Sequence, residues 1–88
     1  MYSLAISPSL KKKLAKLGKK DPKLAEIIFK KVGEIVQDPH QYKNLRAPLQ
    51  EWKRVHIDKH FVLTFSIDDD SETVVLEDLD HHDSIYKH

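Results

Sequence analysis

Two short runs of alternating polar and apolar residues constrain the fold of this chain more than any other feature. The first run covers residues 52–57 and the second covers residues 61–67. Alternation with a period of two is the pattern of a β-strand. Because Asp58-Lys59-His60 alone separates the runs, we expect them to form an antiparallel hairpin.

The length of this connection also fixes the register of the hairpin. A three-residue connection keeps the apolar side chains of both strands on one face, whereas a two-residue connection would mix the faces. The predicted pairs are Ile57 with Phe61, Val55 with Leu63, and Lys53 with Phe65. The face opposite the core then carries Trp52, Arg54 and His56, with Val62 and Thr64 across from them. We expect any chemistry on this polar face.

Two helices are predicted before the hairpin. Ser7-Pro8 supplies an N-cap and a proline tolerated at the first helical position. Leucines at helical spacing follow until Gly18, which is a favourable residue just after a helix. Asp21-Pro22 repeats the start signal, and an apolar stripe continues to about Gln37. The short connection predicts an antiparallel helical hairpin.

The remaining elements complete a single domain over residues 1–88. Residues 2–6 alternate as a first strand, and residues 73–79 form a fourth strand whose inward face stays ambiguous. Residues 40–51 are interpreted as a loop anchored by Tyr42 and Leu45. The predicted order is β-α-α-β-β-β, an α+β fold in which the helical hairpin packs on a small antiparallel sheet.

Composition excludes some classes of protein. The chain has no cysteine, so a disulfide framework and a thiolate metal site are both excluded. No apolar run approaches the roughly 20 residues that span a bilayer, and the N-terminus lacks the pattern of a signal peptide. We therefore expect a cytoplasmic protein that does not enter a membrane.

The net charge of +1 conceals an asymmetry along the chain. Residues 1–59 hold 14 basic and 6 acidic side chains, a balance of +8, while residues 60–88 hold 1 and 8, a balance of −7. A basic first part is compatible with RNA or with an acidic partner. The alternative, that the lysine-rich helices simply have solvated faces, is favoured for the helix lysines taken alone.

Histidines are the candidate proton-transfer groups. His56 lies on the polar face of the hairpin, and a histidine with an ordinary pKa near 6.5 can give or take a proton at neutral pH. His81-His82 follows the last strand between Asp80 and Asp83, whose carboxylates would raise the histidine pKa and orient the rings. The alternatives are a surface histidine without a role and a solvated tail.

Cations and aromatic side chains accompany these histidines. Arg54 shares a strand face with His56, and Arg46 and Lys53 are near in sequence, which suits the charge that builds up in phosphoryl chemistry. An ordinary ion pair is the alternative for Arg54. Trp52 and Tyr86 could stack on a base or pack in the core. His56 and His60 have the spacing of two metal ligands on one face of a helix. Here His56 is predicted in a strand and His60 in a turn, so the spacing does not bring them to one face. We therefore expect no metal.

Three segments together resemble the RelE/ParE superfamily of toxins from type II toxin–antitoxin systems, most closely the YafQ-like ribosome-dependent endonucleases. The first is residues 45–50, Leu-Arg-Ala-Pro-Leu-Gln, before the second strand. The second is the hairpin itself. The third is the C-terminal run His82-Asp83-Ser84-Ile85-Tyr86. The resemblance covers nearly the whole chain and implies the same order of elements.

The resemblance implies an activity and a site. Such toxins cleave mRNA in the ribosomal A site by attack of a ribose 2′-hydroxyl on the adjacent phosphate, without a metal or other cofactor. It implies that His56 and His82 transfer protons, that Arg54 stabilises the transition state and that Tyr86 holds the nucleotide. The implied substrate-binding residues are Arg46, Lys53, His60, Phe61 and His81.

The resemblance also implies partners and leaves alternatives open. It implies an antitoxin, in a complex that would allow a heterotetramer, together with the ribosome and mRNA. Ala47 stands where YafQ-like members have a histidine, and His60 stands where they have an acidic residue. The alternatives are a ParE-like toxin that inhibits DNA gyrase and a catalytically degenerate member that only binds an antitoxin.

Overall fold

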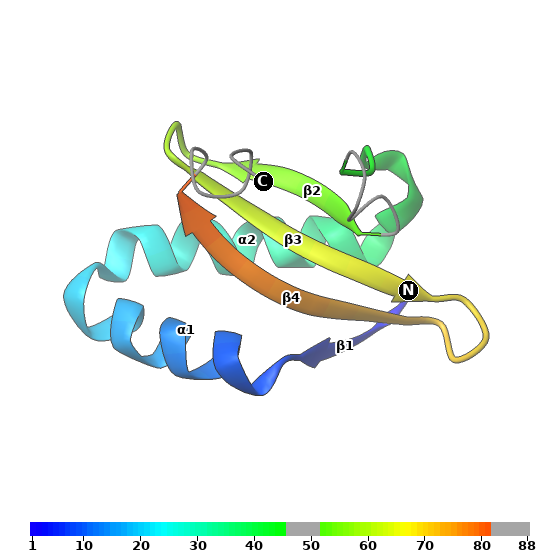
Figure 1. Cartoon of the computed structure of the whole chain (residues 1–88), viewed down its shortest axis with the longest axis horizontal. Coiled ribbons are helices and arrows are strands. Elements are labelled where there is room, and N and C mark those ends of the chain that lie inside the picture. The colour runs from blue at the N-terminus through cyan, green and yellow to red at the C-terminus, as the bar shows by residue number, and fades with distance from the viewer. Residues whose placement is uncertain (46–51, 82–88) are drawn as a thin grey trace.

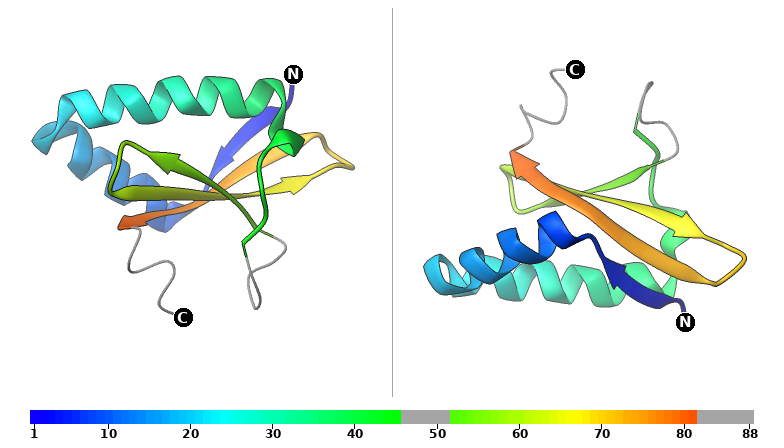
Figure 2. Two further views of the ribbon diagram at one scale, coloured as in Figure 1. Left: turned by 90° about the horizontal axis from the view of Figure 1, so that it is seen from above. Right: turned by 60° about the horizontal axis from the view of Figure 1, so that its bottom comes forward.

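Two helices and four strands make up two layers in the computed structural model, which describes residues 1–45 and 52–81 (Figure 1). The elements in chain order are β1 (Ser3–Ile6), α1 (Pro8–Lys20), α2 (Pro22–Gln37), the short 3₁₀ helix η1 (Pro39–Gln41), β2 (Lys53–Ile57), β3 (Phe61–Asp68) and β4 (Thr73–His81). Both helices cover one face of the sheet (Figure 2). Neither helix is long and apolar enough to cross a membrane, among the residues described. The predicted order and the α+β class are confirmed.

Side-chain caps start both helices where the sequence predicts them. The Ser7 hydroxyl accepts a hydrogen bond from the Leu10 N–H at 3.3 Å, and the Asp21 carboxylate accepts one from the Leu24 N–H at 3.1 Å. The predicted end of α1 at Gly18 is wrong, because the helix continues to Lys20. Asp21 ends α1 through its own N–H, which donates to the Leu17 carbonyl at 2.7 Å.

The sheet has the strand order β1-β4-β3-β2. The β2–β3 hairpin has the predicted register, with Ile57 opposite Phe61 and Val55 opposite Leu63. Its three-residue turn holds Asp58 at a φ of 55°. β1 pairs in parallel with β4, so the sheet is mixed and not wholly antiparallel. Strand periodicity does not reveal this pairing, because β1 meets a strand some 70 residues away in sequence.

A β-bulge settles which face of β4 points inward. Thr64 pairs with Asp78, but the next residue, Phe65, pairs with Leu76, so Glu77 is the extra residue. Leu76 and Leu79 therefore both face the helices although they are three positions apart. Both are buried, as Val74 is. In a strand without a bulge, side chains alternate strictly, so Val74, Leu76 and Leu79 could not all lie on one face.

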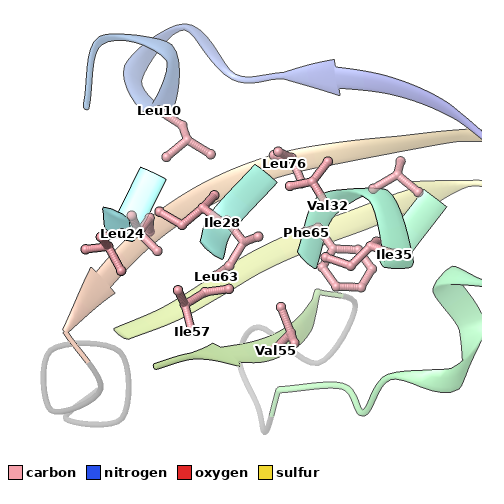
Figure 3. Close-up of a cluster of buried hydrophobic side chains, with 12 residues drawn as sticks. Leu10, Leu24, Ile28, Val32, Ile35, Val55, Ile57, Leu63, Phe65 and Leu76 are labelled. Atoms are coloured by element: carbon pink, nitrogen blue, oxygen red, sulfur yellow. The ribbon is translucent and has the colours of Figure 1, made fainter. Parts of the chain in front are cut away.

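The hydrophobic core lies between the helices and the sheet (Figure 3). Its buried members are Leu10, Leu24, Ile28, Val32, Ile35, Val55, Ile57, Leu63, Phe65, Val74, Leu76 and Leu79. Val62 and Thr64 are also fully buried, although the alternation of β3 directs them to the other face. The Thr64 hydroxyl donates to the Asp78 carbonyl at 3.2 Å, which satisfies this buried polar group.

The segment before β2 pairs with that strand and is more than the predicted loop. The Arg54 N–H donates to the Lys43 carbonyl at 3.0 Å, and the Leu45 N–H donates to the Trp52 carbonyl at 2.8 Å. These bonds flank an antiparallel bridge between Asn44 and Lys53. The predicted anchors are confirmed, because Leu45 is buried and the Tyr42 ring packs edge-on against Phe65, with ring centres 5.7 Å apart.

Candidate functional site

Arg54 and His56 lie on the face of β2 that points away from the helices, as the sequence predicts. Their partners across the hairpin are Thr64 and Val62, both fully buried. Arg54 is partly buried and His56 is exposed. The two side chains therefore stand beside fully buried neighbours in β3.

Lys43 lies beside Arg54 because residues 43–45 pair with β2. Because Asn44 pairs with Lys53, the antiparallel register sets Lys43 directly opposite Arg54. Directly opposed residues share one face of a sheet, so Lys43 stands on the Arg54 face. The sequence does not reveal the place of Lys43, because residues 40–51 are predicted as a loop and a loop has no register. Four residues of mixed polarity carry no signal that could have revealed this pairing.

An open groove of about 350 Å³ runs along this edge of the sheet. Its lining residues are Gln41, Tyr42, Lys43, Arg54, Val55 and His56. The groove thus offers two cations, an imidazole and a side-chain amide to one ligand. Cations attract phosphate, and an imidazole beside them can transfer a proton.

Lys53 lies next to the groove, and its ammonium is bonded within the protein. It pairs with Phe65 in the hairpin and therefore lies on the helix side of the sheet. Its ammonium donates to the Tyr42 carbonyl at 2.9 Å and to the Asn44 side-chain oxygen at 2.8 Å. These two bonds tie the Tyr42–Asn44 segment to β2, and Tyr42 and Lys43 of this segment line the groove. The predicted contact of Lys53 with substrate stays a prediction.

Three other predicted binding residues, His60, Phe61 and His81, are not among the described lining residues of this groove. Phe61 and His81 pair across β3 and β4 with ring centres 4.6 Å apart, and their register places them on the helix side. His60 is exposed in the hairpin turn. Arg46, His82 and Tyr86 lie outside the described residues, so their predicted roles stay predictions. Among the residues described, no three histidine and carboxylate side chains gather as metal ligands would.

A second polar cluster, which we call the Asp69 clasp, consists of Tyr2, His40 and Asp69. The Asp69 carboxylate lies 2.8 Å from the His40 Nε2 atom and accepts a hydrogen bond from the Tyr2 hydroxyl at 3.0 Å. The bonds to His40 and then to Tyr2 lower the pKa of Asp69, and the same Tyr2–Asp69 bond raises the pKa of Tyr2. The clasp joins the chain before β1, the 3₁₀ helix and the β3–β4 turn. Its members were not candidates in the sequence analysis.

Comparison with known proteins places this architecture in a family. Residues 4–86 match the family described as the ParE toxin of the type II toxin–antitoxin system parDE. RelE4 from Methanocaldococcus jannaschii is 58% identical over 87 residues, which cover 99% of this chain and 93% of that protein.

Solved structures share the fold. The toxin–antitoxin complex RelBE2 from Mycobacterium tuberculosis matches with a TM-score of 0.77 and 24% identity, covering 92% of this chain and 91% of that chain. The YoeB/ParE toxin from Agrobacterium tumefaciens matches with a TM-score of 0.81 and 11% identity, covering 91% and 98%. The resemblance predicted from the sequence is confirmed. The chain belongs to the ParE toxin family, within the RelE/ParE superfamily of type II toxin–antitoxin toxins.

Proposed function

We propose that this toxin is a ribosome-dependent mRNA endonuclease whose site is the groove beside β2. The observation that carries the proposal is the placement of Arg54 and His56 side by side on the helix-free face, both lining one open groove. A proton-transfer group next to a fixed cation is the minimum that metal-independent cleavage of RNA needs. A toxin acting on translating ribosomes would work in the cytoplasm.

The proposed reaction needs two proton transfers and one stabilised charge. The ribose 2′-oxygen loses its proton and forms a bond to the adjacent phosphorus, and the bond from phosphorus to the 5′-oxygen breaks. The products are a 2′,3′-cyclic phosphate and a 5′-hydroxyl. His56 and His82 would act as base and acid, in either order. Arg54 would neutralise the charge that grows on the non-bridging oxygens, while Arg46 and Tyr86 would hold the substrate.

Mapping of mRNA 5′ ends in cells tests this proposal. We expect the wild-type chain to create new 5′ ends inside translated regions, and we expect His56→Gln and His82→Gln to remove them, since glutamine cannot exchange a proton at neutral pH. Lys12→Gln, an exposed change in α1, is the control and should cleave like the wild type. Full cleavage by both histidine variants would contradict the proposal.

A ParE-like toxin that inhibits DNA gyrase is the second candidate, and the match to the ParE family model favours it. Inhibition of gyrase would leave transcripts intact while DNA breaks accumulate with gyrase bound to their ends. Measuring mRNA 5′ ends and gyrase-linked DNA in the same cells therefore distinguishes the nuclease from the gyrase inhibitor. Growth arrest with gyrase-linked DNA and without new 5′ ends would support the gyrase function and exclude the nuclease.

We also propose a cognate antitoxin as the partner, in an assembly that could be a heterotetramer. The solved RelBE2 structure is a complex of a toxin with its antitoxin. In this chain, the balance of +8 over residues 1–59 suits an acidic partner. Co-expression of the antitoxin in the mapping experiment should suppress the new 5′ ends. A chain that binds the antitoxin but never produces such ends would be the degenerate member considered above.

A further inference from the structure

We propose that Lys43 is a substrate-contacting cation that holds the RNA phosphate next to the reacting one, and that Lys53 positions it. This inference rests on the proposed function, because it assigns RNA as the ligand of the groove. The sequence does not single out Lys43. The pairing of Tyr42–Leu45 with β2 is what brings it to the site.

The first support is the close approach of two like charges. Lys43 and Arg54 are directly opposed across an antiparallel pair, where the Cβ atoms are typically about 5 Å apart. Two cations so placed raise the positive potential of the groove and favour a polyanionic ligand. Both side chains line the same groove. Neighbouring phosphates of one RNA strand would place a negative charge beside each of these cations.

The second support is the availability of the Lys43 ammonium. Lys43 is exposed, and within the described part of the chain it forms no ion pair. Two other lysines do pair, Lys13 with Asp78 at 2.8 Å and Lys31 with Glu34 at 3.5 Å. Among the residues described, Lys43 can therefore contact a ligand without first breaking an ion pair.

The third support is the rigidity of the backbone that carries Lys43. The Lys53 ammonium donates hydrogen bonds to Tyr42 and Asn44, the residues on either side of Lys43. The Lys43 carbonyl accepts a hydrogen bond from the Arg54 N–H. The Tyr42 ring also packs edge-on against the core residue Phe65. Fixing the backbone before the ligand arrives lowers the entropy cost of binding. Lys53 thus acts through Lys43 as a positioning residue.

The ligand that fits these contacts is single-stranded RNA. A phosphodiester chain presents anions at regular intervals, so one phosphate can sit at Arg54 and His56 while its neighbour meets Lys43. Each phosphate that a cation neutralises adds about 0.7 to the slope of log affinity against log salt for a single strand. This dependence separates a phosphate contact from a purely structural role.

Binding of a fluorescent oligoribonucleotide that carries 2′-O-methyl groups tests the proposal, because such RNA cannot be cleaved. With the full-length protein, we expect Lys43→Gln to weaken binding about 3- to 10-fold and to lower the salt slope by about 0.7. Lys43→Arg should restore both values. Lys12→Gln, which removes an equal charge from α1, is the matched control and should bind like the wild type.

A second variant tests the positioning role. Lys53→Met should weaken binding when Lys43 is present and should have little further effect in the Lys43→Gln background, since coupled residues are non-additive. Equal and independent losses from both changes would show that Lys53 contacts the RNA itself and would overturn its positioning role.

The outcomes separate this inference from the proposed nuclease activity. If Lys43→Gln binds RNA with wild-type affinity and slope, the inference is wrong even if the wild type cleaves mRNA. If RNA binding depends on Lys43 but no cleavage occurs in cells, the groove is an RNA site and the nuclease proposal fails alone. If the wild type does not bind RNA, or if Lys43→Gln weakens only antitoxin binding, the groove is not an RNA site and the inference is overturned.

Discussion

At the scale of single residues, the groove and the Asp69 clasp are two polar clusters with different arrangements of charged side chains. The groove gathers Lys43, Arg54 and His56 on one face, where they can meet an anion. In the Asp69 clasp, the carboxylate is bonded to Tyr2 and His40. The first arrangement suits binding of a ligand, and the second suits stabilisation of the fold.

The clasp predicts a dependence of stability on pH. The lowered pKa of Asp69 in the folded state means that its ionised form stabilises the fold above the unfolded pKa near 3.8. The stabilisation by ionised Asp69 is lost as the pH falls through the lowered pKa of Asp69 in the folded state. Asp69→Asn should therefore reduce the urea midpoint of unfolding at pH 7, and its difference from the wild type should shrink at pH values below 3.8.

Asp70→Asn is the matched control for this measurement, because Asp70 is an exposed carboxylate in the same turn. It should leave the urea midpoint close to that of the wild type at pH 7. Equal midpoints for the wild type and Asp69→Asn at pH 7 would show that the clasp does not stabilise the fold.

At the scale of elements, local patterns predicted the hairpin and the helix starts, while long-range pairing escaped prediction. Three residues between two alternating runs left one register that keeps the apolar faces together, and β2 and β3 adopt it. A bulge at Glu77 breaks the alternation of β4, so its inward face could not be read from a period of two. The parallel β1–β4 pairing and the position of Lys43 depend on partners that no local pattern contains.

The same limit applies to the candidate site. Face and spacing were enough to place Arg54 and His56 together, because both belong to one strand. They were not enough for Lys53, whose ammonium is held by Tyr42 and Asn44 across an unpredicted bridge. Alternation along a strand gives the face of each side chain, but the partners of a lysine depend on which segment lies beside the strand.

Gly18 provides a test at the level of one helix. The sequence places it after the end of α1, where alanine would be strained, but the structure places it inside the helix. Among the described atoms, a methyl group at this position would meet nothing within 4 Å. Gly18→Ala should therefore stabilise the protein by about 0.5–1 kcal/mol, through the better helix propensity of alanine.

Denaturant unfolding measures this change directly, and a gain of 1 kcal/mol would raise the melting temperature of a domain this size by about 4–8 °C. A loss of stability in Gly18→Ala would contradict the observed helix end and would favour a left-handed conformation at Gly18.

At the scale of the whole molecule, the two faces of the sheet divide the surface between two kinds of contact. The helices cover one face of the sheet (Figure 2). They also carry most of the lysines, while the groove lies along the β2 edge of the sheet. The acidic β3–β4 turn, which includes Asp68, Asp69 and Asp70, lies at one end of the sheet (Figure 1). The proposed antitoxin and the proposed RNA ligand would therefore have separate surfaces to approach.

The cleavage rate on purified ribosomes programmed with mRNA tests most directly whether the groove face cleaves RNA, as we propose. At saturating protein, we expect His56→Gln to lower the single-turnover rate about 100-fold or more, as loss of a proton-transfer group does. The Lys12→Gln control should stay within about twofold of the wild type, as expected for a surface change distant from the site. A His56→Gln protein that folds and cleaves at the wild-type rate would contradict the account.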